Sequence, residues 1–240
     1  MKKVALVTGA NRGIGYEITR QLAQHGYQVV MACRNVAQGT AAKQTLVDAG
    51  IEATLLDVMA IDLNDLASIE AAGQLVATQY PDLELLVNNA GIAGDMAKRA
   101  LETTTAEIQT TLDVNLMGTF NLIKALVPTL RHNNGQIANL TGPASATVFY
   151  HPLAYSVSKY ALNGLIQLMA ADFIQHEEPL SIYGIFPGGV STDINHHMQG
   201  PFMKTVEVAG QLVVDLLLDG QEHNGEILAP DGTVISQVQQ

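Results

Sequence analysis

The sequence predicts a doubly wound α/β fold, in which one parallel β-sheet is covered by helices on both faces. Short apolar segments alternate with longer amphipathic segments along the whole chain of 240 residues. Several of the short segments are apolar throughout, which is typical of parallel strands buried on both faces. A glycine-rich turn follows the first of them, as it does where a strand leads into a nucleotide-binding helix. Together these observations indicate a Rossmann-type fold with about seven strands.

Each element follows from the same alternation. The predicted strands are residues 4–8, 28–33, 54–58, 83–87, 136–140, 181–186 and 226–229. The predicted helices are residues 14–25, 39–49, 65–79, 103–131, 152–174 and 204–219. Pro128 and Pro179 lie near the ends of their segments, where proline is expected to end a helix. No internal repeat, linker or low-complexity segment interrupts the pattern, so residues 1–240 are predicted to form a single domain.

Composition narrows the function classes. Hydrophobic residues make up 48% of the chain and charged residues 15%, which is typical of a globular protein. No apolar run reaches the roughly 18 residues of a membrane helix, and the N-terminal apolar run ends at Gly9, too early for a signal peptide. The only cysteine, Cys33, has no partner for an internal disulfide. We therefore expect a cytoplasmic protein.

The charge is unevenly distributed. The formal net charge is −11, which argues against nucleic acid and anionic membranes as partners. Residues 1–50 carry a net charge of +4, so the remaining 190 residues carry −15. The basic first fifth is either chance or a site for a phosphorylated ligand.

The turn after the first strand has the composition of a phosphate cradle. It reads Thr8-Gly9-Ala10-Asn11-Arg12-Gly13-Ile14-Gly15, with glycines spaced G-x-x-x-G-x-G. Glycines allow a tight turn and let the backbone approach a pyrophosphate at the helix N-terminus. Three glycines alone are weak evidence, but their position after the first strand favours a dinucleotide.

The end of the second predicted strand favours NADP over NAD. A protein that prefers NAD places an acid there to bind the ribose hydroxyls. This chain has Cys33 followed by Arg34 at that position. A guanidinium donates paired hydrogen bonds to a phosphate, and Arg12 in the glycine turn could reach the same 2′-phosphate. We therefore expect NADP as the cofactor.

Tyr155 and Lys159 form a candidate acid/base pair. They are four residues apart on a predicted helix, so they share one face. An ammonium about 4 Å from a phenol, at an effective dielectric of about 20, favours the phenolate by roughly 4 kcal/mol. That effect would bring the tyrosine pKa from about 10 toward neutrality, as acid–base catalysis at neutral pH requires. An isolated Tyr and Lys at this spacing are more often partly exposed surface residues. Whether this pair is catalytic therefore depends on the other motifs of the chain.

Four motifs occur together in order: the glycine turn, Asn88-Asn89-Ala90-Gly91, the Tyr155/Lys159 pair, and Pro187-Gly188-Gly189-Val190-Ser191-Thr192-Asp193. In these motifs and their spacing the chain resembles the short-chain dehydrogenase/reductase family over nearly its full length. The resemblance implies an oxidoreductase that transfers hydride between NADP and a small carbonyl or alcohol.

The resemblance also assigns roles. It implies that Tyr155 is the proton donor, that Lys159 tunes it and binds the nicotinamide ribose, and that Asn115 holds a proton-relay water. It implies that Asp62 and Leu63, in preference to Asp57, contact the adenine. The remaining cofactor contacts implied by the family motifs are Gly9, Asn11, Arg12, Gly13, Ile14, Gly15, Asn88, Ala90, Gly91, Pro187, Gly188, Val190 and Thr192.

One position departs from the family pattern. The family places a serine 13 residues before the tyrosine to polarise the substrate carbonyl, and this chain has Gly142 there. The nearest hydroxyls belong to Thr141 and Ser145. We expect Thr141 to be the second donor in preference to Ser145, or neither of them to serve.

The expected function is reduction of a small carbonyl compound. The alternative, motivated by Gly142, is an NADP-binding sensor or scaffold with little catalysis. We expect substrate choice to depend on loops 93–100, 142–152 and 193–204. The pair His196-His197 lacks the cluster that a metal site needs, so no metal is expected. Apolar residues on more than one face of the 103–131 and 152–174 helices predict a homodimer or homotetramer: Leu112, Leu116, Phe120, Leu162, Ile166 and Met169.

Overall fold

The computed structural model describes residues 3–146 and 152–239. Its main sheet has eight strands in the order β10-β9-β6-β5-β4-β1-β2-β3. The strands are β1 Val4–Thr8, β2 Gln28–Cys33, β3 Leu56–Ala60, β4 Leu83–Asn88, β5 Gln136–Leu140, β6 Ser181–Ile185, β9 Ile227–Leu228 and β10 Val234–Ser236. The pair of β7 Gly189–Val190 and β8 Met203–Lys204 forms a separate small sheet.

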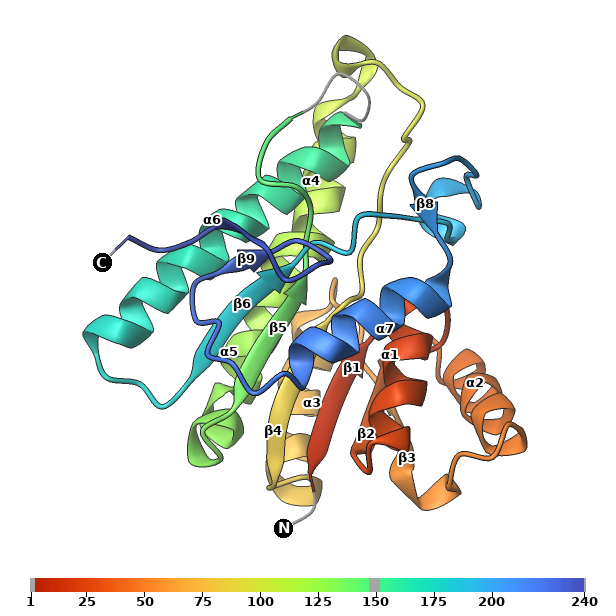
Figure 1. The fold of residues 1–240 in the computed structure, drawn as a ribbon, viewed down its shortest axis with the longest axis vertical. Coiled ribbons are helices and arrows are strands. Elements are labelled where there is room, and N and C mark those ends of the chain that lie inside the picture. Colours follow the sequence, from red (N-terminus) through yellow and green to blue (C-terminus); the bar gives the residue numbers. More distant parts are fainter. Residues whose placement is uncertain (1–2, 147–151, 240) are drawn as a thin grey trace.

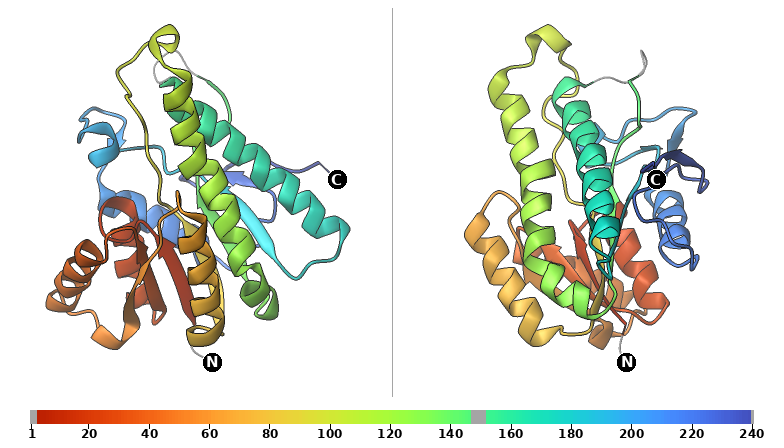
Figure 2. Two further views of the ribbon diagram at one scale, coloured as in Figure 1. Left: turned by 180° about the vertical axis from the view of Figure 1, so that it is seen from behind. Right: turned by 90° about the vertical axis from the view of Figure 1, so that its left-hand side faces the viewer.

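The helices cover both faces of the sheet (Figures 1 and 2). They are α1 Gly13–Gln24, α2 Val36–Asp48, α3 Leu66–Gln79, α4 Thr105–Leu112, α5 Thr119–His132, α6 Leu153–Gln175 and α7 Val206–Leu217. The predicted α/β fold with a mostly parallel sheet is confirmed.

Strand β1 shows why its sequence is apolar throughout. All five of its residues are buried, and they point alternately into two cores. Val4 and Leu6 pack in the core under α3, α5 and α6, whereas Ala5 and Val7 pack in the core under α1, α2 and α7. Because side chains of a strand alternate between faces, a strand covered on both sides needs apolar residues at every position.

The differences from the predicted elements have local causes. An eighth strand, β10, pairs antiparallel with β9 after a turn at Gly232, whose φ is +81°. Residues Ala53–Leu55 form a short 3₁₀ turn, so β3 begins at Leu56 and not at residue 54. Pro128 is an exposed residue inside α5, four residues before the helix ends at His132.

The predicted 103–131 helix is two α-helices joined by the π-helical segment Asp113–Gly118. A π-helical segment inserts extra residues into the helical ladder and often occurs at functional sites. Here the insertion contains Asn115.

The topology brings the candidate residues to one edge. Strands β1 and β4 are neighbours, and the chain crosses to opposite sides of the sheet from them. Ligands of doubly wound folds bind at the carboxyl ends of the strands beside such a switch point. The glycine turn, Arg34, the Asn88–Gly91 segment, Thr141 and Pro187 each follow the carboxyl end of a strand.

Candidate active site

The glycine turn leaves the N-terminus of α1 open to an anion. Gly9 and Gly13 have φ values of +66° and +57°, a conformation that favours glycine. A Cβ on Gly15 would overlap the Asn89 side chain and the Gly9 carbonyl. Arg12 at the N-cap makes no side-chain capping bond, and the first turn holds no acid. The first N–H groups of this helix are thus suited to a pyrophosphate.

The loop after β4 is fastened to that turn through Thr8. The Thr8 hydroxyl accepts hydrogen bonds from the backbone N–H groups of Asn89 (2.9 Å) and Ala90 (3.0 Å). The Asn89 side chain donates to the Thr8 carbonyl at 2.8 Å. Sequence reasoning missed these anchoring roles, although a threonine at the end of β1 and the second asparagine of the motif were signals for them.

Asn88 is 5% exposed, and its amide donates to Asn139 Oδ1 at 2.9 Å. Its own Oδ1 is buried without a hydrogen-bond partner among the described residues. Asn139 in turn donates to the Tyr183 carbonyl at 3.0 Å, which ties β4, β5 and β6 together. The structure therefore gives the Asn88 side chain a partner inside the sheet as well as a place beside the expected ribose site.

Asn115 bridges the β4 loop and α6. Its Oδ1 accepts from the Ile92 backbone N–H at 2.8 Å, and its Nδ2 donates to the Ile92 carbonyl at 2.8 Å and to Ser158 Oγ at 3.0 Å. The Ser158 hydroxyl donates to the Tyr155 carbonyl at 2.7 Å. The Asn115 side chain thus links the β4 loop to the turn of α6 that carries Tyr155. Ser158 was missed because nothing in its spacing distinguished it.

Tyr155 and Lys159 lie on one face of α6, with the Lys159 Nζ 5.6 Å from the centre of the Tyr155 ring. Lys159 is 5% exposed, and its ammonium donates to the Leu140 carbonyl at 2.7 Å. Burial lowers the pKa of Lys159 to about 8 and raises the pKa of Tyr155 to about 12. The expected lowering of the Tyr155 pKa is not seen, because desolvation of the phenol outweighs the attraction of an ammonium that is directed toward Leu140.

Thr141 does not present its hydroxyl as expected. The side chain is 4% exposed, and its hydroxyl donates to Asn163 Oδ1 and approaches the Lys159 carbonyl at 3.4 Å, both on α6. The Asn163 amide approaches the carbonyls of Gly142 and Pro143 at 3.4 Å each. The hydroxyl thus anchors the turn after β5. Asn163 was missed because it lies within an otherwise apolar helical stripe.

The turn after β5 also explains the departure from the family serine. A Cβ on Gly142 would lie 2.9 Å from Lys159 Cβ, so α6 approaches too closely for a side chain. Ser145 is exposed, and residues 147–151 of the expected substrate loop lie outside the described residues.

The two arginines differ in their surroundings. Arg34 is exposed and makes no side-chain hydrogen bond or ion pair within the part of the chain that the structure describes. Arg12 is paired with Asp193, with 2.8 Å between Nη1 and Oδ2. Cys33 is buried at the end of β2 and offers no carboxylate to accept hydrogen bonds from ribose hydroxyls; burial raises the pKa of its thiol.

The other expected cofactor residues lie at the same edge. Asp62 comes two residues after β3 and accepts a hydrogen bond from the Asn64 N–H at 3.0 Å. Asp57 is the second residue of β3 and is bonded to Gln28, at the opposite end of the strand. Gly188 has a φ of +78°, and Val190 belongs to β7. Asn11 donates a hydrogen bond to Gln38. The remaining expected cofactor residues lie in the segments that follow β1, β3, β4 and β6: Gly13, Ile14, Leu63, Ala90, Gly91, Pro187 and Thr192.

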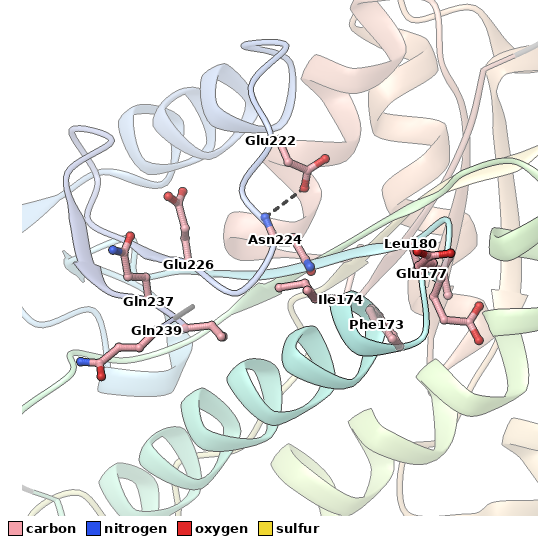
Figure 3. A pocket seen from close by; sticks show the side chains of 11 residues that line it. Phe173, Ile174, Glu177, Leu180, Glu222, Asn224, Glu226, Gln237 and Gln239 are labelled. Carbon is pink, nitrogen blue, oxygen red and sulfur yellow. Dashed lines mark hydrogen bonds between the residues drawn. The ribbon is translucent and has the colours of Figure 1, made fainter.

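A cavity of about 870 Å³ lies elsewhere, between the end of α6 and the C-terminal residues (Figure 3). Its lining includes Ile174, which is 19 residues from Tyr155 and therefore about 28 Å along α6. It is not part of the candidate active site. Among residues 3–146 and 152–239, no group of His, Cys, Asp and Glu could hold a metal ion, and no helix is long and apolar enough to cross a membrane.

The sequence pattern of the short chain dehydrogenase family matches residues 3–200. The chain belongs to this family of oxidoreductases. The 3-oxoacyl-(acyl-carrier-protein) reductase FabG of Staphylococcus aureus is 34% identical over 197 residues, which cover 81% of this chain and 77% of that protein. Sepiapterin reductase of Chlorobaculum tepidum is 28% identical over 89% of both chains.

Solved structures of short-chain dehydrogenases are similar over nearly the full length. The NADPH-bound carbonyl reductase from chicken fatty liver superimposes with a TM-score of 0.85 at 25% identity, covering 98% of this chain and 99% of that one. A metagenomic short-chain oxidoreductase in complex with NADP gives a TM-score of 0.76 at 28% identity, with coverage of 95% and 97%.

Proposed function

We propose that this short-chain dehydrogenase binds NADP(H) and reduces a small carbonyl compound to an alcohol, with Tyr155 as the proton donor. The observation that carries the proposal is that the partly buried Tyr155 and the buried Lys159 share one face of α6, at the edge where the glycine turn lies. When bound, NADPH supplies the hydride to the carbonyl carbon.

The protonation state of Tyr155 suits reduction. A phenol whose pKa is raised to about 12 holds its proton at neutral pH. In the reductive direction the developing alkoxide needs a proton, and a protonated phenol can donate it. Oxidation would need the phenolate, which the buried site disfavours. The raised pKa therefore suits Tyr155 to the role of proton donor in reduction.

Lys159 supports the donor in two ways. With a pKa of about 8, Lys159 is mostly protonated at neutral pH. Its positive charge therefore stabilises the negative charge left on the phenolate after proton donation. Its hydrogen bond to the Leu140 carbonyl fixes it between β5 and α6. Asn115, through Ser158, holds the turn of α6 that carries Tyr155.

The cofactor preference rests on charge. Arg12 and Arg34 lie near the first two strand ends, and the acid that would bind the ribose hydroxyls of NAD is replaced by Cys33. The uncapped N-terminus of α1 fits the pyrophosphate. The solved relatives with bound NADPH or NADP support the same choice. Thr141 we assign to anchoring the turn after β5, which leaves Tyr155 as the side-chain donor.

Turnover tests the proposal. NADPH oxidation is followed with aldehydes, ketones, a pterin and 3-oxoacyl thioesters, and cofactor binding is measured separately by calorimetry. Tyr155→Phe should bind NADPH within a few-fold of the wild type and lose about 10²- to 10⁴-fold in kcat. Tyr160→Phe, one helical turn further on, is the matched control and should stay near wild type. Cofactor binding without turnover of any carbonyl would favour the sensor or scaffold instead.

A further inference from the structure

An ion pair joins the glycine turn to the segment that follows β7. Arg12, in the turn between β1 and α1, lies 2.8 Å from Asp193 through Nη1 and Oδ2. The two residues are far apart in the sequence, yet their segments touch: a Cβ on Gly13 would lie 3.9 Å from Thr192 Cγ2. The segment from β7 to β8 therefore contacts the turn expected to hold the cofactor phosphates.

Asp193 also holds the shape of this segment. Its other oxygen, Oδ1, lies 2.8 Å from His197 Nε2. The His197 N–H donates to the Thr192 carbonyl at 2.9 Å, which closes a compact turn. His196 and His197 have φ values of +54° and +55°, so two consecutive non-glycine residues occupy the left-handed region. Such a conformation is strained and persists only where surrounding contacts hold it.

Arg12 thus has an anionic partner within the chain itself. An arginine paired with a carboxylate has less charge to offer a second anion, because the carboxylate repels that anion across a few ångströms. Arg34 has no such partner within the described residues. The 2′-phosphate is the one group that distinguishes NADP from NAD, so a carboxylate beside a phosphate-binding arginine acts on NADP selectively.

We propose that Asp193 is a specificity-determining residue that acts through Arg12. Asp193 neutralises Arg12 and holds the 192–197 turn against the glycine turn, so the 2′-phosphate of NADP must compete with Asp193 for Arg12. Asp193 is a positioning residue, since it weakens NADP relative to NAD without being a ligand of either. The proposal rests on the proposed use of NADP(H).

Calorimetric titration of NADP⁺ and NAD⁺ tests this. Asp193→Asn keeps the side-chain shape and removes one negative charge, so NADP⁺ should bind about 3- to 10-fold more tightly while NAD⁺ changes less than about 2-fold. In an Arg12→Ala background the same change should give no gain. Asp215→Asn, which removes one exposed charge from α7, is the control for net charge and should leave the NADP⁺:NAD⁺ ratio unchanged.

A second measurement uses the empty protein. Asp193→Asn and Arg12→Ala should each accelerate proteolytic cleavage within residues 192–204, and the double variant should be cleaved no faster than the faster single variant. An unchanged cofactor ratio in Asp193→Asn, or a gain that persists without Arg12, overturns the proposal. Failure of the proposed function is distinct: a wild type without carbonyl turnover can still show the cofactor ratio, and a wild type that binds neither cofactor leaves only the cleavage measurement. Unaltered cleavage in both single variants would in that case overturn the proposal for Asp193 too.

Discussion

Replacing Lys159 by methionine should abolish turnover and leave the protein as stable as the wild type or more so. Lys159 is 5% exposed, and burial lowers its pKa from 10.5 to about 8. Each pKa unit corresponds to about 1.4 kcal/mol, so keeping this ammonium buried costs folding about 3 kcal/mol at neutral pH. Methionine has a similar length and no charge.

The hydrogen bond to Leu140 opposes this gain. Losing the donor to that carbonyl costs about 1–3 kcal/mol. The net effect of Lys159→Met is therefore between no change and a stabilisation of about 2 kcal/mol at pH 7. Urea denaturation of the two proteins measures it, with Lys124→Met, at an exposed position of α5, as the control.

The pH dependence of the stability difference between the two proteins distinguishes removal of a buried charge from better packing of the methionine. The buried lysine releases its proton near pH 8, whereas the unfolded chain keeps it until about pH 10.5. Between these values the unfolded state binds more protons, so the wild type gains stability as pH rises, by up to about 1.4 kcal/mol per pH unit. The advantage of the variant should shrink from pH 8 upward. A variant less stable by more than about 1 kcal/mol, with a pH-independent difference, would refute the reasoning.

Four further outcomes are expected. Thr141→Val should lower the melting temperature, because it removes the buried bond to Asn163, and keep kcat within a few-fold; a 100-fold loss of kcat at unchanged stability would restore its catalytic role. Gly142→Ser should be destabilised and no faster, since its Cβ meets Lys159, and a sharp rise in kcat would contradict this. Burial alone would lower the pKa of His223, but its hydrogen bonds to two carboxylates raise it; wild-type stability relative to His223→Gln should therefore be greatest below about pH 6.5 and decline as pH rises above it, and a difference that is constant across pH in urea denaturation would count against this. We expect a homodimer or homotetramer, and Leu168→Lys, at a 74% exposed apolar position of α6, should reduce the mass measured by light scattering; a monomeric wild type would defeat the expectation.

The surface expected for such an oligomer was only partly predictable. Helices α4 and α6 lie side by side in both views of Figure 2. Leu162 and Ile166 were expected on the contact face, yet they are 2% and 0% exposed in the chain's own core. Among the described residues of the π-helical segment and α6, the exposed large apolar side chains are Met117, Leu168 and Ile174. A helix that is apolar on several faces does not reveal from its sequence which face the sheet covers.

The fold was predictable because parallel strands that are buried on both faces must be apolar, and short helices between them must be amphipathic. Strand β10 was missed, although Pro230, Asp231 and Gly232 between two apolar segments are a turn signal. The π-helical segment was missed because apolar residues on several faces of 103–131 hide a shift in helical periodicity.

The sequence predicted where the site residues lie, but it did not predict their hydrogen bonds or the directions of their pKa shifts. Motif spacing places Tyr155 and Lys159 on one helical face, and the structure has them there. The direction of the Tyr155 pKa depends on burial and on where the Lys159 ammonium points, which spacing does not contain. For the same reason neither the Thr141–Asn163 bond nor the Arg12–Asp193 pair could be anticipated.

The bridge built by Asn115 determines where this chain can accept insertions. On one side the Asn115 side chain is hydrogen-bonded to the backbone N–H and carbonyl of Ile92. On the other side it donates to Ser158, whose hydroxyl donates to the carbonyl of Tyr155. The peptide just before Ile92 is fixed to Thr8 in turn. One residue added between the Thr8 contacts and Ile92 would move the proton donor relative to the glycine turn.

Residues 93–104 begin beyond the last of these contacts. Their polar contacts are local, such as the Lys98–Glu107 pair. Segments of different length exchanged there would change what surrounds a substrate while the distance from the glycine turn to the proton donor stays fixed. Exchange of this loop would therefore change the surroundings of a bound substrate without moving Tyr155 relative to the glycine turn.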